Sequence, residues 1–402
     1  MTAATVAFFC MAEGGHFRRL RPLICAEVAA GTDVVVFTDR AFAWAVREDG
    51  ARFVDLFAGR PLSVADDESR PLPCRYVSFA GRFADSIIAE ARALRPRLVI
   101  TDSFAVIGRV VAAALDVPHV NVCSGHNVHP AHFLPMLAED PRVDVSDACH
   151  RAVERLRERF GLEAPSPFSF VAPPSPFLNV YCEPRQYLTA AERASFEPVV
   201  FFGSLPEPEP RPRCAPPAFP VGAERRVYVC FGTVVWHYYA REAITTLRSI
   251  AAAVARRPGT FALMSLGGAS LAGELVAELQ GRRVRVMSYV EQRSVLAQAD
   301  AFVTHHGLNS THEAVFHRVP MLSHPFFWDQ PALARRAQDF GVALPLASAP
   351  RAAVDADDVE EGLDRLGSEH ARLGAALERA HGWEEEVLAS RPATVRRIAE
   401  LV

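Results

Sequence analysis

Ser288–Gln330, SYVEQRSVLAQADAFVTHHGLNSTHEAVFHRVPMLSHPFFWDQ, is the stretch that decides the fold. It alternates strand-like and helix-like pieces. Ala301–Thr304 is a short apolar strand, a helical pattern runs from about Leu308 to Arg318, and Met321–Ser323 is the next strand. Such alternation favours a parallel sheet covered by helices. In these sheets ligands bind at the carboxyl ends of the strands, and the polar residues of the stretch fall at those ends.

The polar cluster that follows the first of these strands is typical of an anion site. Gly307 allows a ligand to approach the backbone closely, and the N–H groups of the turn at Asn309 and Ser310 open a helix. His305 and Ser310 add side-chain donors. Glu313 lies one helical turn further on the same face, where a carboxylate could accept both hydroxyls of a ribose. We expect this cluster to bind a nucleoside diphosphate.

Two further turns complete the predicted donor site. Asp329 and Gln330 put an acceptor and an amide side by side at a strand exit, where they could hold sugar hydroxyls. Gly232 and Thr233 follow the strand Val227–Phe231 and are interpreted as a loop on the phosphate side of the ligand. The alternative for this second turn is an ordinary strand–helix connection.

The pattern THxGxNSxxE, followed by VPM and by a proline with Asp-Gln four residues later, resembles the donor-binding signature of the UDP-glycosyltransferase family, which has the GT-B fold. The lead-in from Tyr289 to Gln292 resembles the opening of that signature, with Tyr for the common Trp and Glu291 for the usual Pro. The resemblance implies that Tyr289 stacks on the nucleotide base and that Val290 and Gln292 belong to the same nucleotide site.

The composition sets bounds on the protein class. A chain of 402 residues suits two domains of about 200 each. Its net charge of −4 gives no indication of nucleic-acid binding. No apolar run approaches the roughly 20 residues of a membrane span, and no signal peptide is evident. Eight cysteines without CxxC pairs disfavour disulfides and zinc. We expect a cytoplasmic protein without a metal.

The alternation of strands and helices predicts two doubly wound, parallel-sheet (Rossmann-like) α/β domains that face each other across a cleft. We assign residues 1–205 to an acceptor-binding domain and residues 223–385 to a nucleotide-sugar-binding domain. The linker, 206–222, falls within a run with seven prolines between Gly203 and Gly222, which cannot form a helix or a sheet. The resemblance implies that a last helix, 386–402, packs back on the first domain. The predicted terminal helices are Val354–Leu366, Glu369–Leu388 and Thr394–Val402.

A candidate base lies near the start of the chain. His16 follows Gly14-Gly15, where the first strand turns into its helix, and Asp102 ends the strand Leu98–Thr101. A carboxylate bonded to one ring nitrogen leaves the other free to accept a proton from a hydroxyl. The resemblance implies that these two residues form the catalytic dyad of the family. The alternative is a residue of the helix start and a helix cap.

Other histidines carry less specific signals. His126, His129 and His132 stand three residues apart, but Pro130 interrupts the helix that would align them on a metal. We interpret them as a wall or polar group of the acceptor pocket. Surface or packing positions are assigned to His306, His312 and His317. The aromatic run Trp236–Tyr239 fits either a cleft lining or core packing.

The chain is therefore predicted to be a hexosyltransferase. By the resemblance, the reaction is inverting and needs no metal or cofactor, and a nucleoside diphosphate sugar, preferably UDP-linked, is the co-substrate. The acceptor would be a hydroxyl of a small hydrophobic or aromatic natural product. Alternatives are a dTDP-deoxysugar transferase of antibiotic biosynthesis, a nucleotide-sugar epimerase, a lipid-linked sugar transferase, or an auxiliary protein without activity. The oligomeric state is open, with a homodimer among the alternatives. The sequence lacks GxGxxG, GxxxxGK[ST] and Gx[ST]xG motifs.

Overall fold

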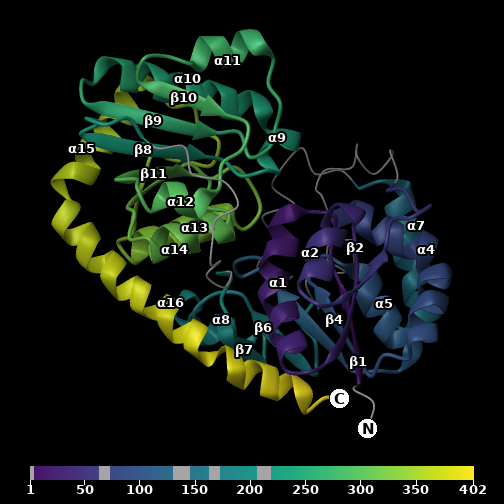
Figure 1. Ribbon diagram of the computed structural model, residues 1–402. Helices are drawn as coiled ribbons and strands as arrows, with labels where there is room; N and C mark the ends of the chain where they lie inside the picture. The colour runs from purple at the N-terminus through teal and green to yellow at the C-terminus, as the bar shows by residue number, and fades with distance from the viewer. Residues whose placement is uncertain (1–3, 63–72, 130–144, 163–172, 206–218) are drawn as a thin grey trace. The chain divides into compact units, whose positions relative to one another are not determined.

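The computed structural model describes residues 4–62, 73–129, 145–162, 173–205 and 219–402. The chain divides into two compact units. Unit 1 comprises Met1–Pro206 and Val387–Val402, and unit 2 comprises Glu207–Glu386. Most of the predicted linker, 206–222, lies outside the described residues. Each unit contains a parallel sheet with helices packed on it (Figure 1), so the predicted fold class of two doubly wound α/β domains is confirmed.

The sheet of unit 1 has seven strands in the order β3-β2-β1-β4-β5-β6-β7. Its strands are β1 Thr5–Phe9, β2 Asp33–Thr38, β3 Arg52–Asp55, β4 Leu98–Asp102, β5 His119–Cys123, β6 Leu178–Tyr181 and β7 Val199–Phe201. The described helices are α1 Gly14–Ala29, η1 Arg40–Phe42, α2 Ala43–Glu48, α4 Pro73–Leu94, α5 Val106–Leu115, α7 Asp147–Phe160, η3 Arg185–Tyr187 and α8 Ala190–Ala194. The strand order reverses between β1 and β4, which are paired neighbours. Ligands of open α/β sheets bind at such a reversal.

The sheet of unit 2 has six strands in the order β10-β9-β8-β11-β12-β13. Its strands are β8 Arg225–Cys230, β9 Thr260–Ser265, β10 Val284–Met287, β11 Ala301–Thr304, β12 Met321–Ser323 and β13 Ala343–Pro345. Its helices are α9 Val235–Tyr238, α10 Ala240–Arg256, α11 Gly273–Leu279, α12 Gln292–Leu296, α13 Leu308–Phe316, α14 Gln330–Asp339, α15 Ala356–Ser368 and the first part of α16 His370–Ala399. Here the order reverses between β8 and β11.

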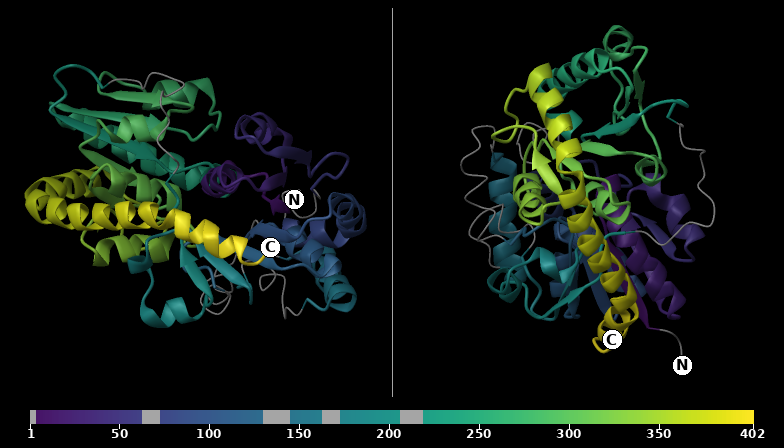
Figure 2. Two further views of the ribbon diagram at one scale, coloured as in Figure 1. Left: turned by 60° about the horizontal axis from the view of Figure 1, so that its bottom comes forward. Right: turned by 90° about the vertical axis from the view of Figure 1, so that its left-hand side faces the viewer.

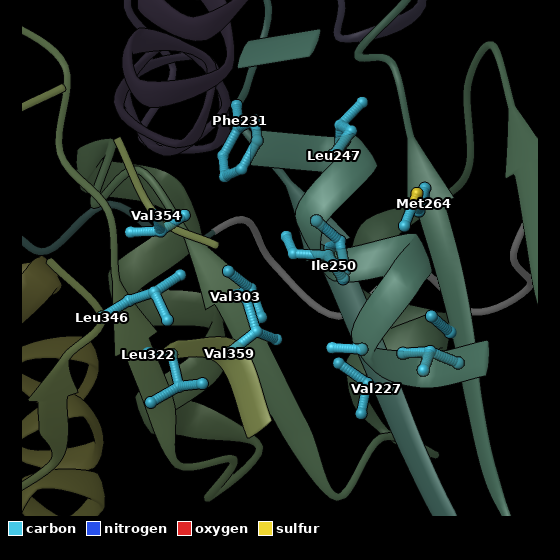
Figure 3. Packing of buried hydrophobic residues seen from close by; sticks show 14 of the residues in the cluster. Val227, Phe231, Leu247, Ile250, Met264, Val303, Leu322, Leu346, Val354 and Val359 are labelled. Atoms are coloured by element: carbon cyan, nitrogen blue, oxygen red, sulfur yellow. The ribbon is translucent and has the colours of Figure 1, made fainter. Parts of the chain in front are cut away.

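The largest described core cluster of unit 2 explains why the sheet and its helices hold together. Alternate residues of the central strands, such as Val227 and Val303, point to the side on which α10 and α15 pack. Leu247 and Ile250 of α10 and Val359 of α15 meet them there (Figure 3). These side chains are almost fully buried, and removal of apolar surface from water is the dominant favourable contribution to folding.

The end of the chain differs from the prediction of separate helices. α16 is one continuous helix that contains Pro392 (Figure 2). Proline lacks the N–H group that bonds the preceding turn, which is why a break was expected. Contacts outside the helix hold its last part in unit 1. The Arg391 guanidinium donates to the carbonyls of Phe202 and Leu205, and the Ser390 hydroxyl donates to that of Phe201 at 3.2 Å.

Within the described ranges, none of the helices is long and apolar enough to cross a membrane.

Candidate active site

Unit 1 brings His16 and Asp102 together at the reversal of strand order. His16 stands in the first turn of α1, which follows β1, and Asp102 is the last residue of β4. The Nδ1 atom of His16 lies 3.0 Å from Oδ1 and 2.8 Å from Oδ2 of Asp102. A carboxylate can only accept a hydrogen bond, so Nδ1 carries the proton. Nε2 is then the ring nitrogen able to take a proton from a substrate.

The environment keeps Asp102 ionised. Burial alone would raise the pKa of this carboxyl group, which is 1% exposed, but the charge and hydrogen bond of His16 oppose it. A hydrogen bond from Ser124 and the charge of Arg19 act in the same direction, and the net pKa of Asp102 lies below its usual value. The ring of His16 is fixed in addition by the edge of Phe104, at 4.7 Å between ring centroids.

Ser124 is a member of this group that the sequence reasoning missed. Its hydroxyl donates to Oδ1 of Asp102 at 2.5 Å and lies 3.2 Å from Nδ1 of His16. It follows β5, which pairs with β4 in the sheet. The signal was present in the sequence, because Ser124 is the first polar residue after a buried strand, as Asp102 is at the end of β4.

Unit 2 brings Gly232, His305 and Gly307 together at its own reversal of strand order. Gly232 follows β8 and His305 follows β11. A Cβ atom on Gly232 would lie 2.5 Å from Nε2 of His305, and one on Gly307 would lie 2.4 Å from the same atom. Both distances are shorter than real contacts, so glycine at these positions makes room for the imidazole. Thr233, half-buried, follows Gly232 in the same turn.

A third glycine supports this turn. Gly267 follows β9, has a positive φ of 60°, and would place a Cβ only 2.1 Å from the carbonyl oxygen of Gly232. The sequence reasoning did not single it out. The glycine pair Gly267-Gly268 directly after a buried strand was the available signal.

α13 begins beside His305 with an uncapped N-terminus. Gly307 is its N-cap residue and provides no side-chain hydrogen bond to the first turn, in which Asn309 and Ser310 stand. The first N–H groups of a helix lack partners within the helix, and the helix dipole favours negative charge there. The predicted diphosphate site therefore has the backbone arrangement that an anion requires.

The nucleotide side of this predicted site is organised by Gln292. Its amide nitrogen donates to Oε2 of Glu313 at 2.7 Å and to the hydroxyl of Ser310 at 3.1 Å. These contacts join α12 to α13. Tyr289, just before α12, is 54% exposed, which leaves a ring face open for stacking. The side chain of Val290 is buried in a core cluster, so a contact of this residue with a ligand would have to come from its backbone.

The predicted sugar clamp is also partly used by the protein itself. The side-chain oxygen of Gln330 accepts hydrogen bonds from the backbone N–H groups of Phe326 and Phe327, at 2.9 and 3.3 Å. Gln330 can therefore offer a ligand only its amide N–H groups. Asp329 precedes it as the N-cap of α14 and is half-buried.

The remaining histidines take structural positions. His306 is fully buried and lies 3.1 Å from the Thr311 hydroxyl and 2.8 Å from that of Ser323, so of the two predicted kinds of position it takes the packing one. Burial, and then the neighbouring His305, lower the pKa of His306 to about 3. His312 is likewise fully buried. His317 is partly buried.

In the segment His126–His132, Nδ1 of His126 lies 2.8 Å from a carboxylate oxygen of Glu183, and the His129 ring packs against Phe196. His132 lies outside the described residues. Across the part of the chain that the structure describes, no group of three or more His, Cys, Asp or Glu could hold a metal ion. In the run Trp236–Tyr239, Tyr239 packs against Phe327 at 5.2 Å, which favours core packing for that residue.

Similarity to known proteins agrees with this geometry. Residues 210–366 match the family described as UDP-glucoronosyl and UDP-glucosyl transferase. The oleandomycin glycosyltransferase of Streptomyces antibioticus is 27% identical over 96% of this chain and 91% of its own. The solved glycotransferase of kitacinnamycin covers both chains fully with a TM-score of 0.78 and 23% identity. The calicheamicin glycosyltransferase CalG4 covers 100% of this chain and 98% of its own, with a TM-score of 0.72 and 21% identity.

The two solved structures have the fold of this chain, the relative is similar in sequence over almost its whole length, and the family match covers residues 210–366. The resemblance stated from the sequence is thereby confirmed. We conclude that the chain is a glycosyltransferase of the GT-B fold and that its residues 210–366 are related to the UDP-glucoronosyl and UDP-glucosyl transferases.

Proposed function

We propose that the protein moves a hexose from a UDP-sugar to a hydroxyl group of a small hydrophobic or aromatic natural product, with inversion at the anomeric carbon. The observation that carries this proposal is the contact between His16 and Asp102, because it leaves one imidazole nitrogen ready to accept a proton. The oleandomycin, kitacinnamycin and calicheamicin names of the related proteins support an acceptor of the natural-product class.

The proposed reaction begins with the base in unit 1. Nε2 of His16 takes the proton of the acceptor hydroxyl, and the ionised Asp102 stabilises the imidazolium that forms. The acceptor oxygen forms a bond to the anomeric carbon from the side opposite the diphosphate. The bond from that carbon to the diphosphate oxygen breaks with its electron pair, and the diphosphate leaves.

Unit 2 stabilises the leaving group in this proposal. Charge grows on the diphosphate as its bond breaks, and fixed donors aimed at that charge lower the barrier. The donors are His305, the Ser310 hydroxyl and the N-terminus of α13, with Thr233 on the adjoining turn. They lie on a rigid framework of strand ends and require no metal ion.

The choice of UDP rests on Glu313. Its carboxylate, oriented by Gln292, has lone pairs for two hydroxyl donors. The ribose of UDP has two such hydroxyls, whereas the deoxyribose of dTDP has one. The exposed Tyr289 provides the stacking surface for the base.

Calorimetric titration with UDP and dTDP tests the donor assignment. We expect UDP to bind about tenfold more tightly than dTDP, the equivalent of one hydrogen bond to a charged group. Tighter binding of dTDP would leave the fold and the base intact and would favour a deoxysugar donor. Failure of both nucleotides to bind would contradict the donor site.

A further inference from the structure

A buried contact between α13 and α16 lies behind the predicted donor site. Nδ1 of His312 is 2.5 Å from Oε1 of Glu384, and both side chains are completely excluded from solvent. The other oxygen of Glu384, Oε2, has no hydrogen-bond partner among the described residues. A buried carboxylate of this kind depends strongly on the partner that it has, because water cannot replace it.

His312 belongs to α13, the helix that carries the proposed donor-binding residues, but its side chain projects from a different face of that helix. Successive residues of an α-helix turn by about 100°, so Ser310 and Glu313, three residues apart, share one face, while His312, two residues after Ser310, projects from a different one. The ligand side of α13 is tied to Gln292 through Ser310 and Glu313. The contact with Glu384 is the corresponding tie on the side of α16.

Two more contacts follow the same face of α16. Nδ1 of His381 lies 2.8 Å from the carbonyl oxygen of Phe316, so the imidazole donates to the last turn of α13. Glu378 pairs with Arg318 just beyond that turn. Glu378, His381 and Glu384 are spaced three residues apart, which places them along one side of a helix. Of these three residues, only Glu384 is fully buried, while Glu378 is exposed.

We propose that His312 and Glu384 are positioning residues for the donor: their hydrogen bond fixes the rotation of α13, and with it the direction of the Ser310 and Glu313 side chains. This inference rests on the proposed donor site. Neither residue touches the reacting atoms. A loss of the bond therefore weakens binding of the nucleotide and leaves the deprotonation by His16 unchanged.

The test compares nucleotide binding with stability. The double variant His312→Leu/Glu384→Leu removes both partners of the contact together, and replacing a buried ion pair by apolar residues often preserves stability. The variant nevertheless lacks the hydrogen bond between His312 and Glu384 that is proposed to fix the rotation of α13. We expect its midpoint of thermal unfolding to stay close to that of the wild type while the Kd for UDP rises about tenfold. We expect the KM for the donor to rise with it and kcat to fall, because Ser310 and the N-terminus of α13 also donate to the leaving diphosphate. The KM for the acceptor should remain unchanged.

Two single variants complete the experiment. Glu384→Gln keeps an oxygen that can accept from His312, and it should bind UDP nearly as well as the wild type. Glu378→Gln removes an exposed pair from the same helix face and serves as the matched control, with no change in UDP binding. A double leucine variant that unfolds at the wild-type temperature and binds UDP with wild-type affinity would overturn the inference. The double leucine variant could fail to fold, and Glu384→Gln then decides alone. Because this variant keeps an acceptor for His312, a rise of about tenfold or more in its Kd for UDP would also contradict the inference.

The outcome also separates this inference from the proposed function. If the wild-type protein binds neither UDP nor dTDP, the proposed donor site is wrong. If the wild type binds UDP and the double leucine variant binds it equally well, the donor site stands and only the positioning role fails.

Discussion

In unit 1 the strands beside the reversal of strand order, β1 and β4, lead to a histidine and an aspartate in direct contact. In unit 2 the corresponding strands, β8 and β11, lead to Gly232 and His305, and the histidine ring is flanked by glycines. The same sheet order therefore presents two kinds of chemistry. One reversal holds an imidazole oriented by a carboxylate, which suits it to accept a proton, and the other holds donors that suit an anion.

The histidines that follow β1 in unit 1 and β11 in unit 2 also differ in the groups that surround them. His16 contacts the carboxylate of Asp102 through Nδ1, which leaves Nε2 as the ring nitrogen that can accept a proton. His306 has only hydroxyl partners and a neighbouring histidine, and its burial lowers its pKa to about 3. We therefore expect that a position after a strand does not by itself make a histidine a base, and that the carboxylate partner distinguishes the proposed base His16 from the buried His306.

The largest effect is expected for His16→Ala. Without the base, turnover should fall by about 10²- to 10⁴-fold, the range for loss of general base catalysis. Initial rates with a UDP-sugar and an acceptor measure this change. Wild-type turnover in the variant would show that His16 is not the base, and only the donor site in unit 2 would remain of the proposed mechanism.

A smaller but still large effect is expected for Gly307→Ala. The added Cβ would meet Nε2 of His305 at 2.4 Å, so the imidazole must move. Loss of one well-placed donor to a developing negative charge costs about 10²-fold or more in kcat in other enzymes. We expect a loss of this order in kcat/KM for the donor. The matched control is Gly273→Ala in α11, where no atom lies within 4 Å of the added Cβ and activity should be unchanged.

Tyr289→Ala should have a moderate effect confined to unit 2. Stacking of a base on an aromatic ring contributes about 1–3 kcal/mol, so the Kd for UDP should rise by about tenfold. Tyr289→Phe preserves the ring and should bind UDP like the wild type. Equal binding by the alanine and phenylalanine variants would show that the exposed ring does not contact the base.

The smallest effect concerns acid stability. Burial lowers the pKa of His324 to about 4, and that of His306 to about 3, from a usual value of 6.5. Below pH 6.5 the unfolded chain therefore binds protons that these folded residues do not, and stability falls as the pH decreases toward 4. Each group changes the free energy of unfolding by at most about 1.4 kcal/mol per pH unit.

NMR titration of the histidine ring signals measures these two pKa values directly. We expect neither ring to titrate above pH 5, in contrast to exposed histidines. A midpoint near 6.5 for either residue would show that its environment is wetter than the structure indicates.

Much of this account could be predicted from the sequence because local patterns and strand ends carry it. β11 and β12 have the predicted bounds, since apolar runs define them without help from distant residues. The pairing of His16 with Asp102 was implied by the family resemblance, and the positions of both residues after strands agreed with it. The glycines at 232 and 307 were identifiable because close approach to a ligand or ring requires them.

The missed features depend on contacts between distant residues. Ser124 joins Asp102 only because β5 pairs with β4, and strand order cannot be read from a local pattern. Pro392 did not end α16, because Ser390 and Arg391 anchor the helix from outside. The oxygen of Gln330 is used by a turn whose geometry the sequence did not reveal.

The most direct test of the division between the two units is a calorimetric titration of UDP into the wild type, His16→Ala and Gly307→Ala. The account predicts that His16→Ala binds UDP as the wild type does although it turns over slowly, and that Gly307→Ala binds UDP at least about tenfold more weakly. Loss of UDP binding in His16→Ala together with full binding in Gly307→Ala would contradict the assignment of base and donor site to separate units.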